Sequence, residues 1–120
     1  MNEKNIILEK SFKFAIRIVN LYKYLSKNKK EYVLSKQLLR SGTSIGANIK
    51  EAQAGESKKD FISKMSIASK EARESQYWIE LLIQTDFLDI KQKNTQTLKN
   101  DIEELIKIIT SIVKTSKENI

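Results

Sequence analysis

Apolar side chains recur along most of the chain at steps of three and four residues, which is the period of an amphipathic α-helix. Short polar stretches separate four such segments, and the pattern predicts helices over residues 3–27, 31–55, 58–85 and 90–116. Four helices of this length with short connections pack most economically in an up-down-up-down arrangement. We therefore expect an all-α fold, a single four-helix-bundle domain over residues 1–120.

One apolar stripe of each predicted helix is expected to face the core. The expected core residues are Leu8, Phe12, Ala15, Val19 and Tyr22 in the first helix, Leu34, Leu38, Ser41, Ile45, Asn48 and Ala52 in the second, Phe61, Met65, Ala68, Ala72, Ser75, Ile79 and Leu82 in the third, and Leu98, Ile102, Leu105, Ile109 and Ile112 in the fourth. Gly55 is expected to end the second helix in a positive-φ conformation. Ser57 with Asp60 is typical of a capping box. Asp89 with Gln92 repeats that spacing before the fourth helix.

The second predicted helix carries distinctive residues on both flanks of its core stripe, although a single bundle needs only the stripe itself. Gly42 and Gly46 lie on one flank of its core stripe together with Ile49. An interior glycine costs about 1 kcal/mol relative to alanine, so the pair indicates another backbone close by, where a side chain would collide. A local bend without a special neighbour is the alternative. The opposite flank carries Arg40, Ser44, Ala47 and Glu51.

The third predicted helix has an adjoining face on which glutamates lie between apolar residues. Glu71 and Glu74 repel each other slightly if both are exposed, so we expect basic or amide groups such as Arg40 and Asn48 to meet them. The contact lies either across a subunit boundary or beside one, and a solvated acidic strip is the alternative. The candidates for an oligomer interface or polar network are Arg40, Gly42, Ser44, Gly46, Asn48, Glu51, Glu71, Glu74 and Trp78.

The charge of the chain is unevenly distributed. Of the net charge of +7, residues 1–59 supply 13 basic against 5 acidic side chains, whereas residues 60–120 supply 9 against 10. A basic half favours contact with phosphate backbones or an acidic protein, although AT-rich codons alone could produce the many lysines. The candidate nucleic-acid contacts cluster where the first helix ends: Lys23, Lys27, Lys29 and Lys30.

Several function classes lose support from the composition. The chain contains no cysteine and no histidine, so thiol nucleophiles, thiolate metal sites and the usual neutral-pH base are missing. We predict no catalysis, no cofactor and no metal. No apolar run approaches the roughly 20 residues of a membrane span, and a cytoplasmic protein without a membrane partner is expected.

Two segments carry a resemblance to a known family. Residues 35–52, SKQLLRSGTSIGANIKEA, resemble the motif Q-L-x-R-(A/S)-x-x-S-I-x-A-N-I-x-E-(G/A) of the four-helix-bundle proteins encoded in intervening sequences of 23S ribosomal RNA genes. Residues 70–78, KEARESQYW, are similar to the signature of the family's third helix. Many members have proline where Gly46 stands, which implies a local bend. The resemblance implies a homopentameric ring and a relationship to accessory proteins of diversity-generating retroelements, which are basic and associate with nucleic acid and a reverse transcriptase.

Two functions remain open at this stage. The first is a non-enzymatic, basic, ring-forming oligomer that binds RNA or DNA as an accessory factor, with a nucleic-acid-processing protein as a further possible partner. The second is a homo-oligomeric protein–protein scaffold without a nucleic-acid role. Base-stacking aromatic residues on an exposed basic face would favour the first. Tyr24 and Tyr32 lie nearest the lysine-rich turn, but we expect them to pack over the bundle end.

Overall fold

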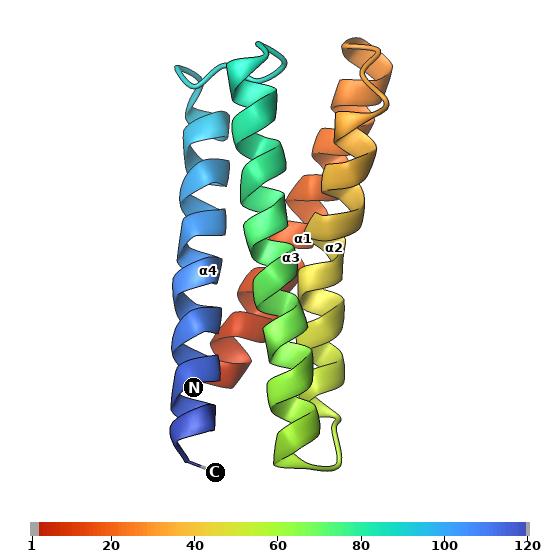
Figure 1. The fold of residues 1–120 in the computed structure, drawn as a ribbon. Coiled ribbons are helices and arrows are strands. Elements are labelled where there is room, and N and C mark those ends of the chain that lie inside the picture. Colours follow the sequence, from red (N-terminus) through yellow and green to blue (C-terminus); the bar gives the residue numbers. More distant parts are fainter. Residues whose placement is uncertain (1–2, 120) are drawn as a thin grey trace.

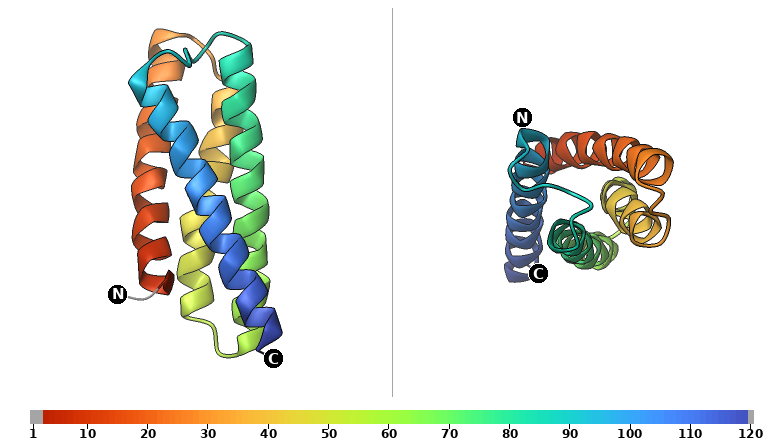
Figure 2. Two further views of the ribbon diagram at one scale, coloured as in Figure 1. Left: turned by 90° about the vertical axis from the view of Figure 1, so that its left-hand side faces the viewer. Right: turned by 90° about the horizontal axis from the view of Figure 1, so that it is seen from above.

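The computed structural model describes residues 3–119 as four helices: α1 (Glu3–Asn28), α2 (Leu34–Gln53), α3 (Lys58–Gln84) and α4 (Lys93–Glu118). They run alternately up and down, as Figures 1 and 2 show. Among the described residues, the backbone of each helix lies close to those of two others, and in the diagonal pairs α1–α3 and α2–α4 no two Cα atoms come within 8 Å of each other. The predicted all-α four-helix bundle is therefore confirmed, with extents of 47 × 22 × 22 Å.

The helix boundaries agree with prediction for α1 and α3 and differ for the other two. The second helix begins at Leu34 instead of residue 31, because the Glu31 carboxylate accepts hydrogen bonds from the backbone N–H groups of the first turn. The fourth helix begins at Lys93 instead of residue 90. Asp89 was predicted to cap it, but its Oδ1 atom accepts from the Lys91 amide at 2.9 Å and so shapes the preceding turn.

The connection between α2 and α3 confirms one predicted cap and contradicts another prediction. Ser57 is the N-cap of α3, and its hydroxyl accepts from the Asp60 amide at 3.1 Å. The positive φ expected at Gly55 is wrong, since no glycine in residues 3–119 has a positive φ. The helix already ends at Gln53, and a Cβ at Gly55 would lie 3.2 Å from the carbonyl oxygen of Ala52. Close contact in the turn is therefore what favours glycine there.

The core stripes of α2, α3 and α4 are largely as predicted, whereas that of α1 is wrong. All five predicted core residues of α4 are buried, and so are six of the seven in α3, with Phe61 partly buried. On α1, however, Phe12 is 66% exposed and Val19 is also exposed. The α1 residues that face the core are Ile7, Ser11, Phe14, Ile18 and Leu25.

The inward face of α1 is set by the surface of α2 on which it lies. The first helix is apolar on more than one side, so its own pattern fits two alternative stripes. Gly42 of α2 leaves room for Ile18, whose Cγ1 atom would lie 2.9 Å from a Cβ at that position. Gly46 likewise leaves room for Ser11. The face of α1 that carries Ser11 and Ile18 therefore packs against the glycine pair.

The length and apolar character of the helices bear on whether one of them could span a membrane. No helix within residues 3–119 combines the length and the apolar character that crossing a membrane requires.

Candidate nucleic-acid interface

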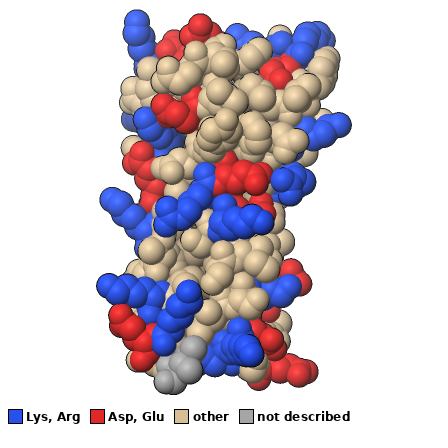
Figure 3. Space-filling model, viewed as in Figure 1, with Lys and Arg blue, Asp and Glu red and all other residues tan. Residues whose placement is uncertain are grey.

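The four candidate lysines lie together at one end of the bundle. Lys23 and Lys27 are on the last turns of α1, and Lys29 and Lys30 follow in the turn to α2. All four are exposed, and none forms an ion pair with a carboxylate among residues 5–119, whose side chains the structure describes. By contrast, basic and acidic side chains are interspersed over the face of the molecule shown in Figure 3.

The turn that holds these lysines is stabilised by the acidic residue that follows them. Lys30 adopts a φ of 55°, in the left-handed region, and the Glu31 amide then donates to the Leu25 carbonyl at 3.0 Å. The Glu31 side chain is buried, and its carboxylate accepts from the amides of Val33, Leu34 and Ser35 at 3.1, 3.0 and 2.7 Å. The carboxylate therefore faces the start of α2 instead of the lysines.

The Glu31 carboxyl has a shifted pKa. Burial raises the pKa of this carboxyl. The backbone hydrogen bonds from Ser35, Leu34 and Val33, together with one from the Ser35 side chain, outweigh that effect, so the pKa lies below its ordinary value. Glu31 is consequently ionised at neutral pH, where its charge complements the amino end of α2.

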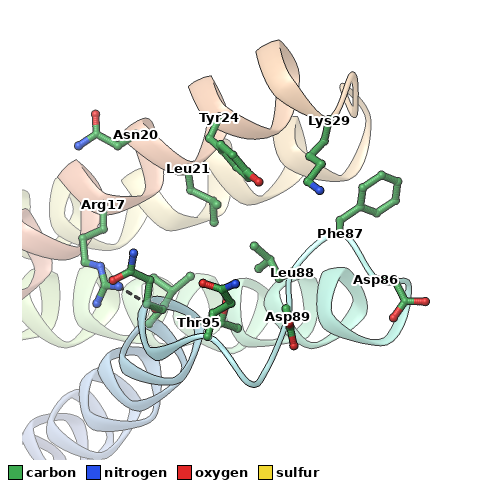
Figure 4. Close-up of a pocket in the computed structure, with 13 residues that line it drawn as sticks. Arg17, Asn20, Leu21, Tyr24, Lys29, Asp86, Phe87, Leu88, Asp89 and Thr95 are labelled. Atoms are coloured by element: carbon green, nitrogen blue, oxygen red, sulfur yellow. Dashed lines mark hydrogen bonds between the residues drawn. The ribbon is translucent and has the colours of Figure 1, made fainter.

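The two tyrosines near the lysines are more open than we predicted. Tyr24 is 44% exposed and Tyr32 is 53% exposed, so neither is packed away over the bundle end. Tyr24 also lines a cleft of about 710 Å³ between the last turns of α1 and the loop from α3 to α4 (Figure 4). The aromatic surface beside the lysine cluster is therefore accessible.

The close backbone expected beside the two glycines is present only at Gly46, where it belongs to α1 of the same chain, whereas Gly42 meets the side chain of Ile18. A Cβ at Gly46 would lie 3.3 Å from the Ser11 hydroxyl and 3.4 Å from the Ser11 carbonyl oxygen. Gly42 and Ile49 are buried within the monomer. This flank of α2 is consequently occupied inside the bundle, which contradicts our placing the two glycines on a surface between subunits.

The predicted contact between Arg40 and Glu74 is confirmed within one chain. Arg40 Nη2 donates to Glu74 Oε2 at 3.1 Å, and the Trp78 indole N–H donates to the same oxygen at 3.2 Å. The Tyr77 ring meets Trp78 edge-on, with the ring centroids 5.0 Å apart. We call Arg40, Glu74 and Trp78 the α2–α3 polar network.

The other predicted polar residues are not joined to this network by any hydrogen bond among the described residues. Asn48 donates to the carbonyl and hydroxyl oxygens of Ser44 one turn before it, at 2.9 and 3.1 Å. Glu51 pairs with Lys64 of α3 at 3.6 Å. Glu71 is only 7% exposed, and its Oε2 atom has no hydrogen-bond partner within the described chain. Of the two residues that we expected to meet a glutamate of α3, Arg40 does so within the chain, whereas Asn48 bonds within its own helix.

Some residues that shape this end of the molecule were not predicted from the sequence. Arg17 joins α1 to α4 by binding Asp101 Oδ2 at 2.7 Å, the Asn94 carbonyl at 2.9 Å and the Thr97 hydroxyl at 3.0 Å. Its partners lie 77 to 84 residues away in the chain, so no local pattern points to them. Glu31 did carry a signal, because an acidic residue just before a helix is a common capping group.

The fold and the polar contacts between its helices define an antiparallel four-helix-bundle protein. The sequence model of the 23S rRNA-intervening sequence protein family matches residues 3–111, and the chain therefore belongs to that family. The predicted resemblance is thus confirmed.

One solved structure is similar to this chain over nearly its whole length. It is the crystal structure of a protein of unknown function from the S23 ribosomal protein family of Bacteroides thetaiotaomicron. The two share 50% sequence identity and a TM-score of 0.89, and the match covers 94% of this chain and 99% of that one. No match was found among curated proteins.

Proposed function

We propose that the chain is a non-enzymatic, homo-oligomeric accessory protein of the cytoplasm that binds the phosphate backbone of RNA or DNA. The observation that carries the proposal is the cluster of four exposed lysines that lack carboxylate partners among residues 5–119: Lys23, Lys27, Lys29 and Lys30. Such cations bind phosphates with the release of counterions, and this binding does not depend on base sequence. The absence of histidine and cysteine from the sequence supports a role without catalysis.

An apolar stripe on the outside of α1 supports self-association. Phe12, Ile16 and Val19 follow at steps of four and three residues and are all exposed, and we call them the α1 outer stripe. Contiguous apolar patches on a monomer commonly mark interaction sites. We propose that a second copy of the chain covers this stripe, in a ring whose pentameric state follows from the family resemblance.

A ring requires two different surfaces on each subunit. The first and third helices lie diagonally opposite each other in the bundle, since no Cα atoms of the two come within 8 Å among the described residues. Ile67 is exposed on α3, and Trp78 is partly exposed there. We propose that this face of α3 meets the α1 outer stripe of the neighbouring copy.

Nucleic-acid binding is tested by fluorescence anisotropy with labelled RNA and DNA between about 50 and 200 mM salt, where counterion release has a large effect. Affinity is expected to fall steeply with salt, and each cluster lysine changed to alanine should reduce the log–log slope by about 0.7–0.9 if it contacts a phosphate. Lys114→Ala removes an equal charge from α4 outside the cluster and serves as the control. Absence of binding at the lowest salt concentration would refute the nucleic-acid role.

Self-association is tested by light scattering at micromolar concentration. Phe12→Glu places a charge in the α1 outer stripe at a position that is 66% exposed in the monomer, so the fold should survive while the oligomer dissociates. Ser111→Glu adds the same charge at an exposed position of α4 and should leave the subunit number unchanged. A monomeric wild type would contradict the assembly.

A protein–protein scaffold is the second candidate, and the α1 outer stripe is the observation that favours it. An oligomer that depends on Phe12 but binds neither RNA nor DNA would support the scaffold in place of the nucleic-acid role.

A further inference from the structure

The cleft beside the lysine cluster has walls of different chemistry. The last turns of α1 form one wall, and the loop from α3 to α4 with the first turns of α4 forms the other (Figure 4). Its volume of about 710 Å³ is in the range of pockets that hold small ligands, roughly 300–1,000 Å³. The residues that the argument uses are Asn20, Leu21, Tyr24, Lys29, Phe87 and Leu88.

The shape of the loop produces the wall opposite α1. Asp86 has a φ of 66°, and the Phe87 amide then donates to the Leu82 carbonyl at 2.9 Å. This turn closes α3 and directs Leu88 into the core, where it is buried. Phe87 remains only partly buried, at the mouth of the cleft.

Two aromatic rings flank the opening. Figure 4 shows Tyr24 pointing from α1 toward the loop, and Phe87 on the loop at the same end of the cleft. The two rings do not stack on each other, and Leu21 and Leu88 provide apolar surface farther in. A planar aromatic ligand can therefore contact the face of Tyr24 without displacing a ring already packed against it.

The charged groups are arranged unequally around the opening. Lys29 points into it from the α1 side, whereas Asp86 and Asp89 on the loop point away from it (Figure 4). Lys23 and Lys27 continue the positive charge along α1. Asn20 lies at the rim of the cleft, and its amide points away from the loop (Figure 4). An anion is therefore favoured on the α1 side of the opening.

From this arrangement we infer that the cleft binds an unpaired nucleotide of a single-stranded nucleic acid. The base stacks on Tyr24, and the adjoining phosphate lies near Lys29. Stacking on aromatic side chains beside a basic track is the common way in which proteins hold single strands. Bases in a duplex are stacked on their neighbours and cannot enter, so the cleft selects single strands. The inference rests on the proposed nucleic-acid role and specifies its ligand.

The test compares a labelled single-stranded oligonucleotide with a duplex of the same length by fluorescence anisotropy at fixed salt. Tyr24→Ala should weaken single-strand binding by roughly five- to 150-fold, the effect expected for the loss of one stacked base, and should leave duplex binding unchanged. Tyr24→Phe keeps the ring and should retain the affinity. Tyr32→Ala removes a tyrosine that is 53% exposed and lies outside the cleft, so it is the matched control.

The outcomes separate this inference from the proposed function. Equal binding of single strand and duplex, with Tyr24→Ala behaving like the wild type, would overturn the nucleotide site and leave backbone binding in place. Absence of binding to both ligands would overturn both proposals. Thermal unfolding of Tyr24→Ala, followed by circular dichroism, establishes that any lost affinity is not a loss of fold.

Discussion

Arg40 Nη2 lies 3.1 Å from Glu74 Oε2, and this ion pair joins α2 to α3 within a single chain. The Arg40 side chain is 64% exposed and that of Glu74 is 28% exposed. Water therefore screens the pair, and a screened pair contributes little to stability.

Reversing either charge should consequently have a small effect in the dissociated monomer, in which no neighbouring copy covers the α3 face that carries Glu74 and Trp78. Arg40→Glu and Glu74→Lys are each expected to lower the free energy of unfolding by at most about 1 kcal/mol, and the double exchange should recover most of it. Urea unfolding gives these values. Emission from Trp78, whose N–H also binds Glu74, gives an independent signal. A loss of about 3 kcal/mol or more for one reversal would instead indicate a desolvated pair, as expected beneath a neighbouring subunit.

Alanine at Gly42 should destabilise the bundle although it favours the helix. The new Cβ would lie 2.9 Å from Ile18 Cγ1 and 3.0 Å from Cγ2, so α1 must shift. Overpacking of this kind costs about 1–3 kcal/mol, against a gain of about 1 kcal/mol in helix propensity. Gly46→Ala meets its nearest atom at 3.3 Å and should cost less. Urea unfolding of both variants checks the order, and greater stability of Gly42→Ala than of the wild type would contradict it.

The Glu31 carboxylate should make stability depend on pH. Its pKa is lower in the folded chain than in the unfolded chain, so its contribution is present above the unfolded value and is lost as the pH falls through the folded value. Glu31→Gln should therefore cost about 1–2 kcal/mol at pH 7. The gap from the wild type should narrow as the pH falls toward about 3, below the ordinary glutamate pKa. Urea titrations at the two pH values measure this, and a gap that does not depend on pH would be the contrary result.

Glycine at Asp86 should stabilise the end of α3. Asp86 has a φ of 66°, where residues other than glycine are strained, and the amides of Asp86 and Phe87 bond back to the carbonyls of Ile83 and Leu82. These two bonds form a Schellman motif, in which glycine is the preferred residue at this position. Asp86→Gly is expected to raise the free energy of unfolding by up to about 1 kcal/mol, part of the gain being offset by the freedom of glycine in the unfolded chain. Thermal unfolding measures it, and a lower midpoint would contradict the assignment of strain.

The number of helices, the inward stripes of α3 and α4 and the Ser57 cap could all be predicted from the amino-acid sequence. Each of these depends on residues close together in the chain. The five apolar positions from Leu98 to Ile112 recur at steps of four and three residues, and this stripe is the buried one. A serine three residues before Asp60 accepts from the Asp60 amide and so caps α3 locally. The pairing of Arg40 with Glu74 could also be predicted from the sequence, because both residues lie on flanks next to the core stripes.

The buried side of α1 and the neighbours of the two α2 glycines could not be predicted in this way, because both depend on how distant segments pack. The first helix has apolar residues on several sides, so its own sequence fits more than one orientation, and close contact of Ile18 with Gly42 selects one. That selection leaves Phe12 exposed. The cleft likewise depends on distant segments, since Tyr24 and Phe87 meet only after α1 and the α3–α4 loop have packed. The spacing of apolar residues predicts which faces of a helix can be buried, whereas packing against a distant segment decides which of those faces is buried.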